Sequence, residues 1–449
     1  MGGAAGGSIQ RGHDPSEASM LDTLRVATEI MAPTVATGVI KRRPRVMAAN
    51  EKLGADRNAI ELAQQLRERY GPGPLRLRMP GRSVALVLSA DDVGTLLAGS
   101  PDPFTPASDE KRASLARFQP HGALISQGSA RTRRREINEA VLDTPKPLHR
   151  LAAQFTTTVR EEGDQLLLAA DADGELSWSA FNRAWWRVVR RVVLGDAARD
   201  AETVTDLLAS LRRSANWAYL GRTDTDAREE FDRGLRRHVD RAEQGSLAAL
   251  IADSGDSDEA TAQVPHWLFA FDAAGMAAMR TLALLASHPE PARRATAEVD
   301  KVDEGPAPLP YLRACVLDTV RLWPTTPALL RESTLSTMWG EKPMPPHTTF
   351  LIYTPLFHRD SRTLPYADRF SPDIWLDGTA RRNPALVPFS DGAGMCPGRN
   401  LVLLLVSTML ARLLESHSYQ LTSDTRLDSE QPLPATLDNF TLRFGLTPR

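Results

Sequence analysis

The residues best suited to do chemistry in this chain lie in a glycine-rich loop around a cysteine. The loop reads Phe389-Ser-Asp-Gly392-Ala-Gly394-Met-Cys396-Pro397-Gly398. Glycine permits positive φ angles and close approach of the backbone to a ligand, so the loop can fold tightly around the sulfur. Pro397 stands where a helix would begin, which places Cys396 at the positive end of a helix dipole and predicts a lowered thiol pKa. The alternative is a cysteine buried beside a glycine turn for packing alone.

This loop resembles the haem loop of the cytochrome P-450 enzymes, and in particular their soluble bacterial type. The family pattern is Phe-x-x-Gly-x-x-x-Cys-x-Gly, and Phe389, Gly392, Cys396 and Gly398 stand at its four fixed positions. The resemblance implies that Cys396 is the metal ligand of haem b, iron protoporphyrin IX, and that the other three residues help to hold the cofactor. In such enzymes the thiolate pushes electron density toward the iron and favours O–O cleavage.

A second motif lies in the segment from Tyr311 to Pro324, which reads as a helix stopped by proline. Asp318 and Arg321 are three residues apart, so they share a helix face and can form a structural pair. They resemble the family's Glu-x-x-Arg motif, with Asp in place of Glu. Ile374 stands where the family has a third member of this group, an arginine, so we expect backbone carbonyls to hold Arg321 instead.

The apolar segment that begins at Trp267 contains one acid, Asp272, among small residues. Ala270, Phe271 and Asp272 fit the family's dioxygen motif, Ala-Gly-x-Asp/Glu-Thr-Thr, while Ala273 and Ala274 occupy the positions of the threonines. The resemblance makes Asp272 the catalytic proton relay and places Ala270 and Ala274 against the cofactor. Since no Ser or Thr occurs between Trp267 and Arg280, we expect nothing on this helix to replace the alcohol. The alternative for Asp272 is an acid satisfied within the core.

Three arginines match positions that bind the haem propionates in the family. Arg135 matches a propionate-binding arginine of the family. Arg131 stands four residues earlier, where the family usually has a Trp or His, and its guanidinium can also reach a carboxylate. Arg331 resembles a further propionate ligand. We expect Arg133 and Arg134 to lie on the proximal face, where an acidic electron donor would bind, or to form a solvated face. The substrate pocket is expected to be apolar and to include Phe271, Ala273, Thr325, Thr326 and Ala328.

The elements that must position these residues are mostly helical. Apolar residues recur at three- and four-residue spacings over residues 21–36, 60–70, 181–193 and 204–219, and strand-like runs occur at 75–78, 83–88 and 348–353. Residues 252–265, 304–310 and 341–346 are expected to be surface connections. We predict a mainly α fold with a small β part, in which residues 1–19 form a disordered Gly-rich tail and residues 20–449 form one cytochrome P-450-like haem-thiolate domain.

The composition indicates which kinds of binding partner and which cellular compartment to expect. There are 54 Lys and Arg against 56 Asp and Glu, a net charge of −2, which gives no general attraction to nucleic acid or to an anionic membrane. The two cysteines make no disulfide framework, no signal peptide is evident, and the apolar segment 267–286 contains Asp272 and Arg280. We expect a cytoplasmic protein that uses neither nucleic acid nor membrane.

The function predicted from these features is oxygen insertion into an apolar small molecule, or its oxidative coupling or cyclisation, with electrons from a separate ferredoxin or flavodoxin. Without the alcohol, water or a substrate hydroxyl must carry the proton, or the enzyme uses peroxide. Two other classes stay open at this point. One is a haem-thiolate protein that binds a ligand without turnover, and the other is a helical binding protein without haem.

Overall fold

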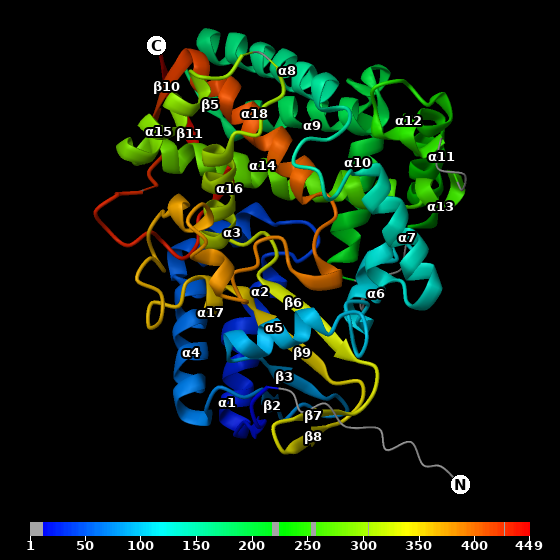
Figure 1. Cartoon of the computed structure of the whole chain (residues 1–449), viewed down its shortest axis with the longest axis vertical. Coiled ribbons are helices and arrows are strands. Elements are labelled where there is room, and N and C mark those ends of the chain that lie inside the picture. Colours follow the sequence, from blue (N-terminus) through cyan, green and yellow to red (C-terminus); the bar gives the residue numbers. More distant parts are fainter. Residues whose placement is uncertain (1–11, 218–223, 253–256, 304, 426) are drawn as a thin grey trace.

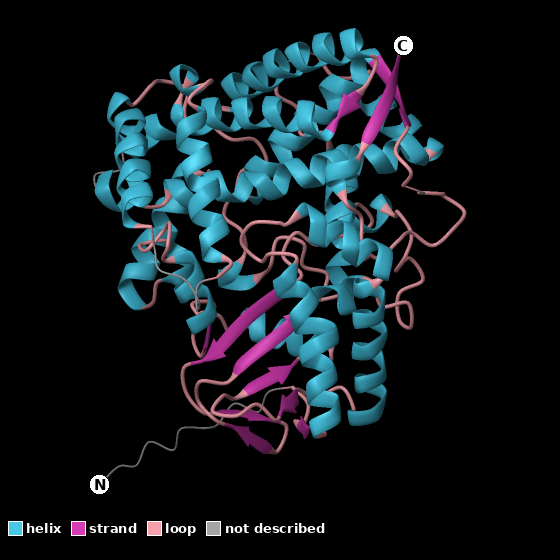
Figure 2. Cartoon of the chain, turned by 180° about the vertical axis from the view of Figure 1, so that it is seen from behind, coloured by secondary structure: helices cyan, strands magenta, loops and turns pink. Residues whose placement is uncertain are grey.

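The computed structural model describes residues 12–217, 224–252, 257–303, 305–425 and 427–449, and shows a mostly helical chain with a small sheet part. The predicted fold class, mainly α with a small β part, is confirmed. Helices gather at one end of the molecule, and a twisted sheet flanked by the N-terminal helices forms the other end (Figures 1 and 2). The predicted tail lies outside the described residues as far as residue 11.

The helices of eight or more residues make up most of the molecule. They are α3 (Pro44–Leu53), α4 (Ala55–Tyr70), α5 (Ala90–Ala98), α7 (Gly128–Val141), α8 (Ala152–Asp173), α9 (Trp178–Leu194), α10 (Glu202–Ala215), α11 (Thr225–Arg241), α14 (Val264–Ser287), α15 (Pro289–Val299), α16 (Pro310–Leu322) and α18 (Arg399–Ser416). The shorter ones are α1 (Met20–Arg25), α2 (Ala32–Ala36), α6 (Asp109–Leu115), α12 (Leu247–Ala252), α13 (Ser257–Thr261) and α17 (Thr354–His358).

The described strands form three sheets. The largest has the order β1-β2-β3-β9-β6-β4, the second β10-β11-β5, and the third is the hairpin β7-β8. Their bounds are β1 (Ser16–Glu17), β2 (Leu75–Leu77), β3 (Val84–Leu86), β4 (Phe104–Thr105), β5 (Leu176–Ser177), β6 (Ala328–Ser333), β7 (Thr337–Trp339), β8 (Lys342–Met344), β9 (Thr349–Tyr353), β10 (His417–Leu421) and β11 (Arg443–Pro448). Two predicted connections are therefore partly regular, since α13 falls within 252–265 and β8 within 341–346.

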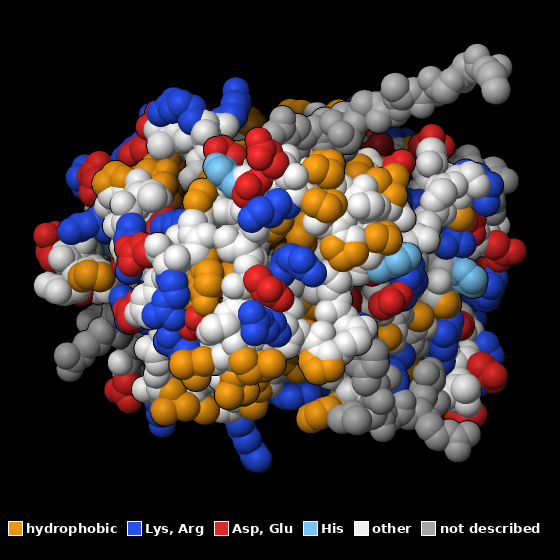
Figure 3. Space-filling model, turned by 90° about the horizontal axis from the view of Figure 1, so that it is seen from below, with side chains coloured by type: hydrophobic (Ala, Val, Ile, Leu, Met, Phe, Trp, Pro, Cys, Tyr) orange, Lys and Arg blue, Asp and Glu red, His pale blue; other side chains and the backbone are white. Residues whose placement is uncertain are grey.

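The domain begins earlier than the sequence predicts. Ser16 and Glu17 pair in parallel with Leu75 and Arg76 of β2, and Ala18 is fully buried. A boundary at residue 20 is therefore too late, because edge pairing to β2 orders the chain four residues before it. Beyond it, α1 and α2 leave several large apolar side chains exposed, and Figure 3 shows apolar side chains gathered along one edge of the face seen from below. The exposed ones on these two helices are Met20, Leu21, Leu24 and Val35.

Helix α14 runs through the larger core. Its packing depends on small residues: a Cβ added at Gly275 would lie 2.7 Å from Trp185 Cδ1, and the Trp185 indole N–H donates to the Phe271 carbonyl at 2.8 Å. Among the described residues, only the stretch 257–287 is long and apolar enough to cross a bilayer, and 83% of its most apolar window is buried inside the protein. We therefore describe α14 as a core helix.

Arg321 on α16 ties the helical core to the segment that precedes the cysteine loop. Its Nε and Nη2 donate to the two carboxylate oxygens of Asp318 at 2.6 and 3.1 Å. Its remaining N–H groups donate to three backbone carbonyls, of His358, Ala367 and Arg369, at 2.6–3.0 Å. The carboxylate of Asp318 also accepts from the Ser371 amide and the Trp375 indole. Backbone groups thus take the place of the missing third side chain, and Ile374 is buried nearby.

Replacement of Arg321 by Ala should prevent stable folding, because it leaves the carboxylate of Asp318 buried without its cation. Breaking a buried pair in this way costs about 3–5 kcal/mol. The measurement is the thermal midpoint and yield of folded protein, with Arg187→Ala as the control. Arg187 pairs with Asp200 at an exposed site, where the expected loss is at most about 1 kcal/mol. Equal melting of the two variants would contradict the role assigned to Arg321.

Candidate active site

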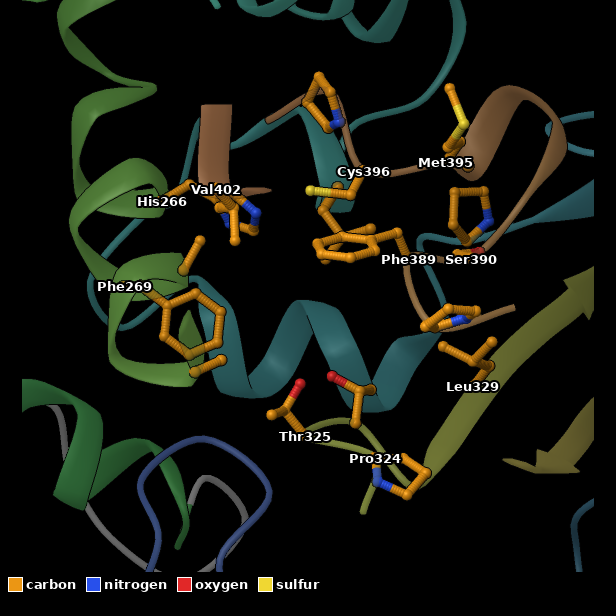
Figure 4. A pocket seen from close by; sticks show the side chains of 18 of the residues that line it. His266, Phe269, Pro324, Thr325, Leu329, Phe389, Ser390, Met395, Cys396 and Val402 are labelled. Atoms are coloured by element: carbon orange, nitrogen blue, oxygen red, sulfur yellow. The ribbon is translucent and has the colours of Figure 1, made fainter. Parts of the chain in front are cut away.

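A cavity lies between α14, β6, α7 and the loop that precedes α18. Cys396, Phe389, Ser390 and Met395 line one side of it, and Pro324 and Thr325 lie on the opposite side (Figure 4). The sulfur of Cys396 points into this space from its own loop (Figure 4). The loop therefore presents the thiol of Cys396 to this cavity.

The loop is fixed by its own backbone. The Cys396 amide donates to the Phe389 carbonyl at 2.9 Å, and the Met395 amide donates to the Gly392 carbonyl at 3.0 Å. Gly392 has a φ of 60°, and a Cβ there would lie 2.2 Å from the Leu97 carbonyl oxygen. Helix α18 then begins at Arg399. Gly392 is thus required by both conformation and space.

The thiol of Cys396 does not have the lowered pKa that its place before a helix predicts. Burial raises the pKa, and the Gly398 amide, Arg135 and Arg399 offset this only in part. Desolvation outweighs the helix dipole because the sulfur faces an enclosed space and not water. A bound metal ion would reverse the balance, since a coordinating thiol loses its proton. The other cysteine, Cys315, is buried within α16 and does not line the cavity.

Three predicted arginines surround the cavity near Cys396. Arg131 donates to the Ala393 carbonyl at 2.7 Å, and Arg135 to the Met395 carbonyl at 2.6 Å. Arg331 is buried and donates to Ser390 Oγ at 3.2 Å and Ser100 Oγ at 2.8 Å. Burial lowers the pKa of Arg331 to about 10, and the pKa of Arg131 is also lowered by burial. The structure therefore brings all three to the cysteine loop, and among the described residues only Arg135 of the three pairs with a carboxylate, that of Glu139.

These residues fit a flat cofactor that carries two carboxylates and a metal ion. Arg131 Nε is buried without a hydrogen-bond partner among the described residues, which indicates a donor held for a ligand. Gly394 lets the loop approach closely, because a Cβ there would lie 2.5 Å from Arg331 Nη2. The thiol supplies one soft metal ligand, and the cations supply charge for the carboxylates. Haem b meets these requirements.

One face of α14 forms a wall of the cavity. Ala270, Ala273 and Ala274 line it, at the spacing expected for one helix face. Their small side chains leave room for a flat group. Phe271 does not line the cavity, although the sequence places it in the pocket: it points to the opposite side of α14 and packs edge-on against Trp185, with centroids 6.4 Å apart.

The strand β6 and the turn before it form another wall. Thr325 and Thr326 line the cavity as predicted, but Ala328 does not. Side chains alternate along a strand, so Leu329 and Arg331 face the cavity together and Ala328 points away. The segment indicated by the sequence therefore lines the cavity, with Leu329 in place of Ala328.

Asp272 also lines the cavity, and it is held as a carboxylate. Its Oδ2 accepts from Arg212 Nη2 at 2.9 Å and from Lys41 Nζ at 3.1 Å. Burial alone would raise the pKa of Asp272, but Arg212 and Lys41 together outweigh it and keep the pKa below its ordinary value. Its Oδ1 has no partner among the described residues. The acid is thus anchored by one oxygen and free at the other.

This chain has Ala273 and Ala274 where the family motif has threonines, and no other residue of α14 supplies an alcohol to the cavity. Thr281 is fully buried, and its hydroxyl donates to the Ala277 carbonyl at 2.8 Å and to Thr319 at 2.9 Å. Hydroxyls that do line the cavity come from other elements, namely Thr325, Thr326, Thr354 and Ser390.

The two remaining basic residues of α7 differ from each other. Arg133 is exposed, as expected for a docking or solvated face. Arg134 is not free: it pairs with Glu259 at 2.6 Å and donates to Ser126 Oγ. The expectation that both present charge to a donor protein therefore fails for Arg134, because α13 supplies it with a carboxylate.

Several residues that line the cavity are not predicted from the sequence. His266 lies one helical turn before Ala270, so the periodicity of α14 alone could have identified it; burial lowers its pKa to about 4. Lys111, Arg42 and Arg212 come from segments far apart in the chain, and no local pattern indicates that they meet. Lys111 Nζ donates to the Leu330 carbonyl at 3.2 Å, beside Arg331, and burial lowers its pKa to about 7.

Part of this chain is similar to a known protein family and to several known proteins. Residues 236–441 match the family model described as "Cytochrome P450". "Cytochrome P450 4c3" of Drosophila melanogaster is 28% identical over 40% of this chain and 35% of its own length, and "Cyclooctat-9-en-7-ol 5-monooxygenase" of Streptomyces melanosporofaciens is 32% identical over 29% and 31%. The mouse "1,25-dihydroxyvitamin D(3) 24-hydroxylase, mitochondrial" is 32% identical over 24% and 22%. The chain thus aligns with about a third or less of the length of these relatives.

The two outer glycines of the loop should respond differently to substitution. Gly392→Ala should lower cofactor content severalfold, because the new Cβ meets the Leu97 carbonyl at a positive φ. Gly398→Ala should leave it nearly unchanged, since a Cβ there meets only Leu142 Cδ1 at 3.8 Å. The measurement is Soret absorbance per mole of purified protein. Equal losses in both variants would show that the loop is not limited by this contact.

Proposed function

We propose that the chain is a haem-thiolate monooxygenase of the cytochrome P450 family, whose model matches residues 236–441. Its reaction would insert one oxygen atom into an apolar small molecule, or couple or cyclise such a molecule oxidatively. The observation that carries this proposal is the thiol of Cys396, which points into a cavity that Arg131, Arg135 and Arg331 also line.

Each group at the cofactor end of the cavity has a separate task. Cys396 would ligate the iron, and Arg131, Arg135 and Arg331 would bind the two carboxylates of haem b. Ala270 and Ala274 leave space for the flat ring against α14. When bound, the haem supplies the oxidant for the substrate, while the protein supplies orientation and protons.

Proton delivery is the task proposed for Asp272. Oxygen insertion follows RH + O₂ + 2e⁻ + 2H⁺ → ROH + H₂O, so two protons must enter the cavity in each turnover. The free Oδ1 of Asp272 can accept a proton from solvent and pass it on through a water molecule or a substrate hydroxyl, because Ala273 offers no alcohol. Lys41 and Arg212 hold the other oxygen in place meanwhile.

The electrons in this proposal come from a separate ferredoxin or flavodoxin. Arg133 supports it, because this exposed cation lies on α7, whose Arg131 and Arg135 bond the cysteine loop. We further propose that the enzyme works in the cytoplasm and uses no membrane. The burial of the one long apolar stretch among the described residues, 257–287, supports this part.

Peroxide use is the second candidate, and Ala273 is the observation that favours it. A peroxide-driven enzyme receives oxygen and protons together, so it needs no alcohol to manage their delivery. A haem-thiolate protein that binds its ligand without turnover would also tolerate Ala273.

Isotope labelling separates these candidates. With NADH, a surrogate reductase and a ferredoxin or flavodoxin, the proposed monooxygenase should place one atom of labelled dioxygen in the product. A peroxide-dependent enzyme should form product only when peroxide is added. No product by either route would leave ligand binding without turnover and overturn the proposed enzymatic function.

Replacement of Asp272 by Asn should lower dioxygen-driven turnover by about a hundredfold, because Asn cannot exchange a proton. Peroxide-driven turnover should fall much less, since peroxide brings its own protons. The measurement is product formed per NADH consumed and per peroxide added, in both proteins. Ala273→Thr is the companion variant and should raise coupling by restoring an alcohol. Equal losses by both routes would make Asp272 a structural acid.

A further inference from the structure

The cavity lining contains far more positive than negative charge. In the part of the chain that the structure describes, six basic side chains and one acid, Asp272, line it; the basic ones are Arg42, Lys111, Arg131, Arg135, Arg212 and Arg331. The two histidines of the lining, His266 and His358, have pKa values lowered by burial to about 4 and about 3, so they add no charge at neutral pH. A buried cation needs a partner, and most of these have no carboxylate of the protein beside them.

The basic residues fall into two groups at opposite ends of the cavity. Arg131, Arg135, Arg331 and Lys111 bond backbone or hydroxyl groups beside the cysteine loop and β6, where the two carboxylates of haem would neutralise them. Arg42 belongs to the other end, because its Nη2 donates to the carbonyl of Thr325 at 2.8 Å, across the cavity from Cys396 (Figure 4). Haem carboxylates do not account for this second group.

Arg212 has donors to spare at that end. Its side chain is only 3% exposed, and its guanidinium lies 4.7 Å from the ring centre of Phe269, which lines the cavity. Its Nη2 is used by Asp272 and by the Ile40 carbonyl. Neither Nε nor Nη1 has a hydrogen-bond acceptor among the described residues. Buried donors left unpaired are costly, so an acceptor from a ligand would stabilise this arrangement.

The positive charge at this end is also only partly neutralised by carboxylates of the protein. Among the described residues, three cations lie at this end, Lys41, Arg42 and Arg212, and the carboxylate of Asp272 pairs with Lys41 and Arg212. Asp56 lies near Arg42 and offsets part of its charge, so the cations exceed the carboxylates by one. Burial also lowers the pKa values of Lys41 and Arg42, as expected for cations without enough counter-charge.

We propose that the substrate is an organic acid, whose carboxylate binds Arg212 and Arg42 at the end of the cavity opposite Cys396 and whose apolar body lies toward the cysteine. The Nη1 group of Arg212 has no acceptor among the described residues, and it can donate a charge-assisted hydrogen bond to a carboxylate oxygen. Phe269, Met276 and Leu329 provide the apolar contacts for the rest of the molecule. This inference rests on the proposed function and specifies its substrate class.

The test measures binding to the haem-loaded protein by calorimetry, which needs no turnover. The probes are two matched pairs, phenylbutyrate with phenylbutanamide and laurate with lauramide. At least one acid should bind at least about tenfold more tightly than its own amide, because only the acid neutralises the excess charge. Failure of both acids to bind, or equal affinity within both pairs, would overturn the proposal.

Variants of α10 identify the responsible group. Arg212→Met should abolish the preference for acid over amide, and Arg212→Lys should retain part of it. Arg213→Met is the matched control, since Arg213 is the adjacent exposed residue, and it should keep the full preference. If Arg212→Met does not fold, Arg42→Met and Arg212→Lys provide the test by weakening acid binding more than amide binding. An unchanged preference in every folded Arg212 and Arg42 variant would contradict the assignment.

The two proposals fail in different ways. If the protein binds acids preferentially but forms no oxygenated product, the proposed carboxylate site is supported and the proposed monooxygenase function is contradicted. If the protein oxygenates neutral compounds and shows no preference for acids, the proposed monooxygenase function is supported and the proposed carboxylate site is contradicted.

Discussion

The need to neutralise buried positive charge is the constraint on which the rest of this structure depends. Arg321 and Arg359 are fully buried, and each is matched by a carboxylate and by backbone carbonyls of the protein. Such arginines tie segments together and need no ligand. The cavity is different, because among the described residues six basic side chains and one acid, Asp272, line it. The same chemistry that stabilises the fold in one place thus indicates a missing anion in another.

The cavity accordingly has two anionic requirements, one at each end of a largely apolar space. Near Cys396 the fixed cations suit a cofactor with two carboxylates, and the glycine loop brings the sulfur to the centre of the same region. At the other end Asp272 satisfies part of the charge of Arg212 and Lys41. Because Asp272 is held by one oxygen only, it can serve both as the anchor of this end and as the proposed route for protons.

Local patterns in the sequence were enough to predict the helical fold, the cysteine loop and the Asp318/Arg321 pair. These features depend on residues close in the chain, with spacings set by helix geometry or by glycine conformation. The sequence could not show that Arg42 and Arg212 meet, since they lie on separate segments that only tertiary packing brings together. It also could not fix the pKa of Cys396, because desolvation depends on the cavity. The misplacement of Ala328 arose from strand register, which one residue reverses.

The most direct measurement is the absorption spectrum of the reduced carbon monoxide complex, in the parent protein and in Cys396→Ser. Thiolate ligation moves the Soret band far to the red, so the parent should show the shifted band and Cys396→Ser should lose it. Cys315→Ser is the matched control and should retain it, since Cys315 is buried outside the cavity. A parent protein without the red-shifted band, or a Cys396→Ser variant that keeps it, would contradict the assignment of Cys396 as the haem ligand.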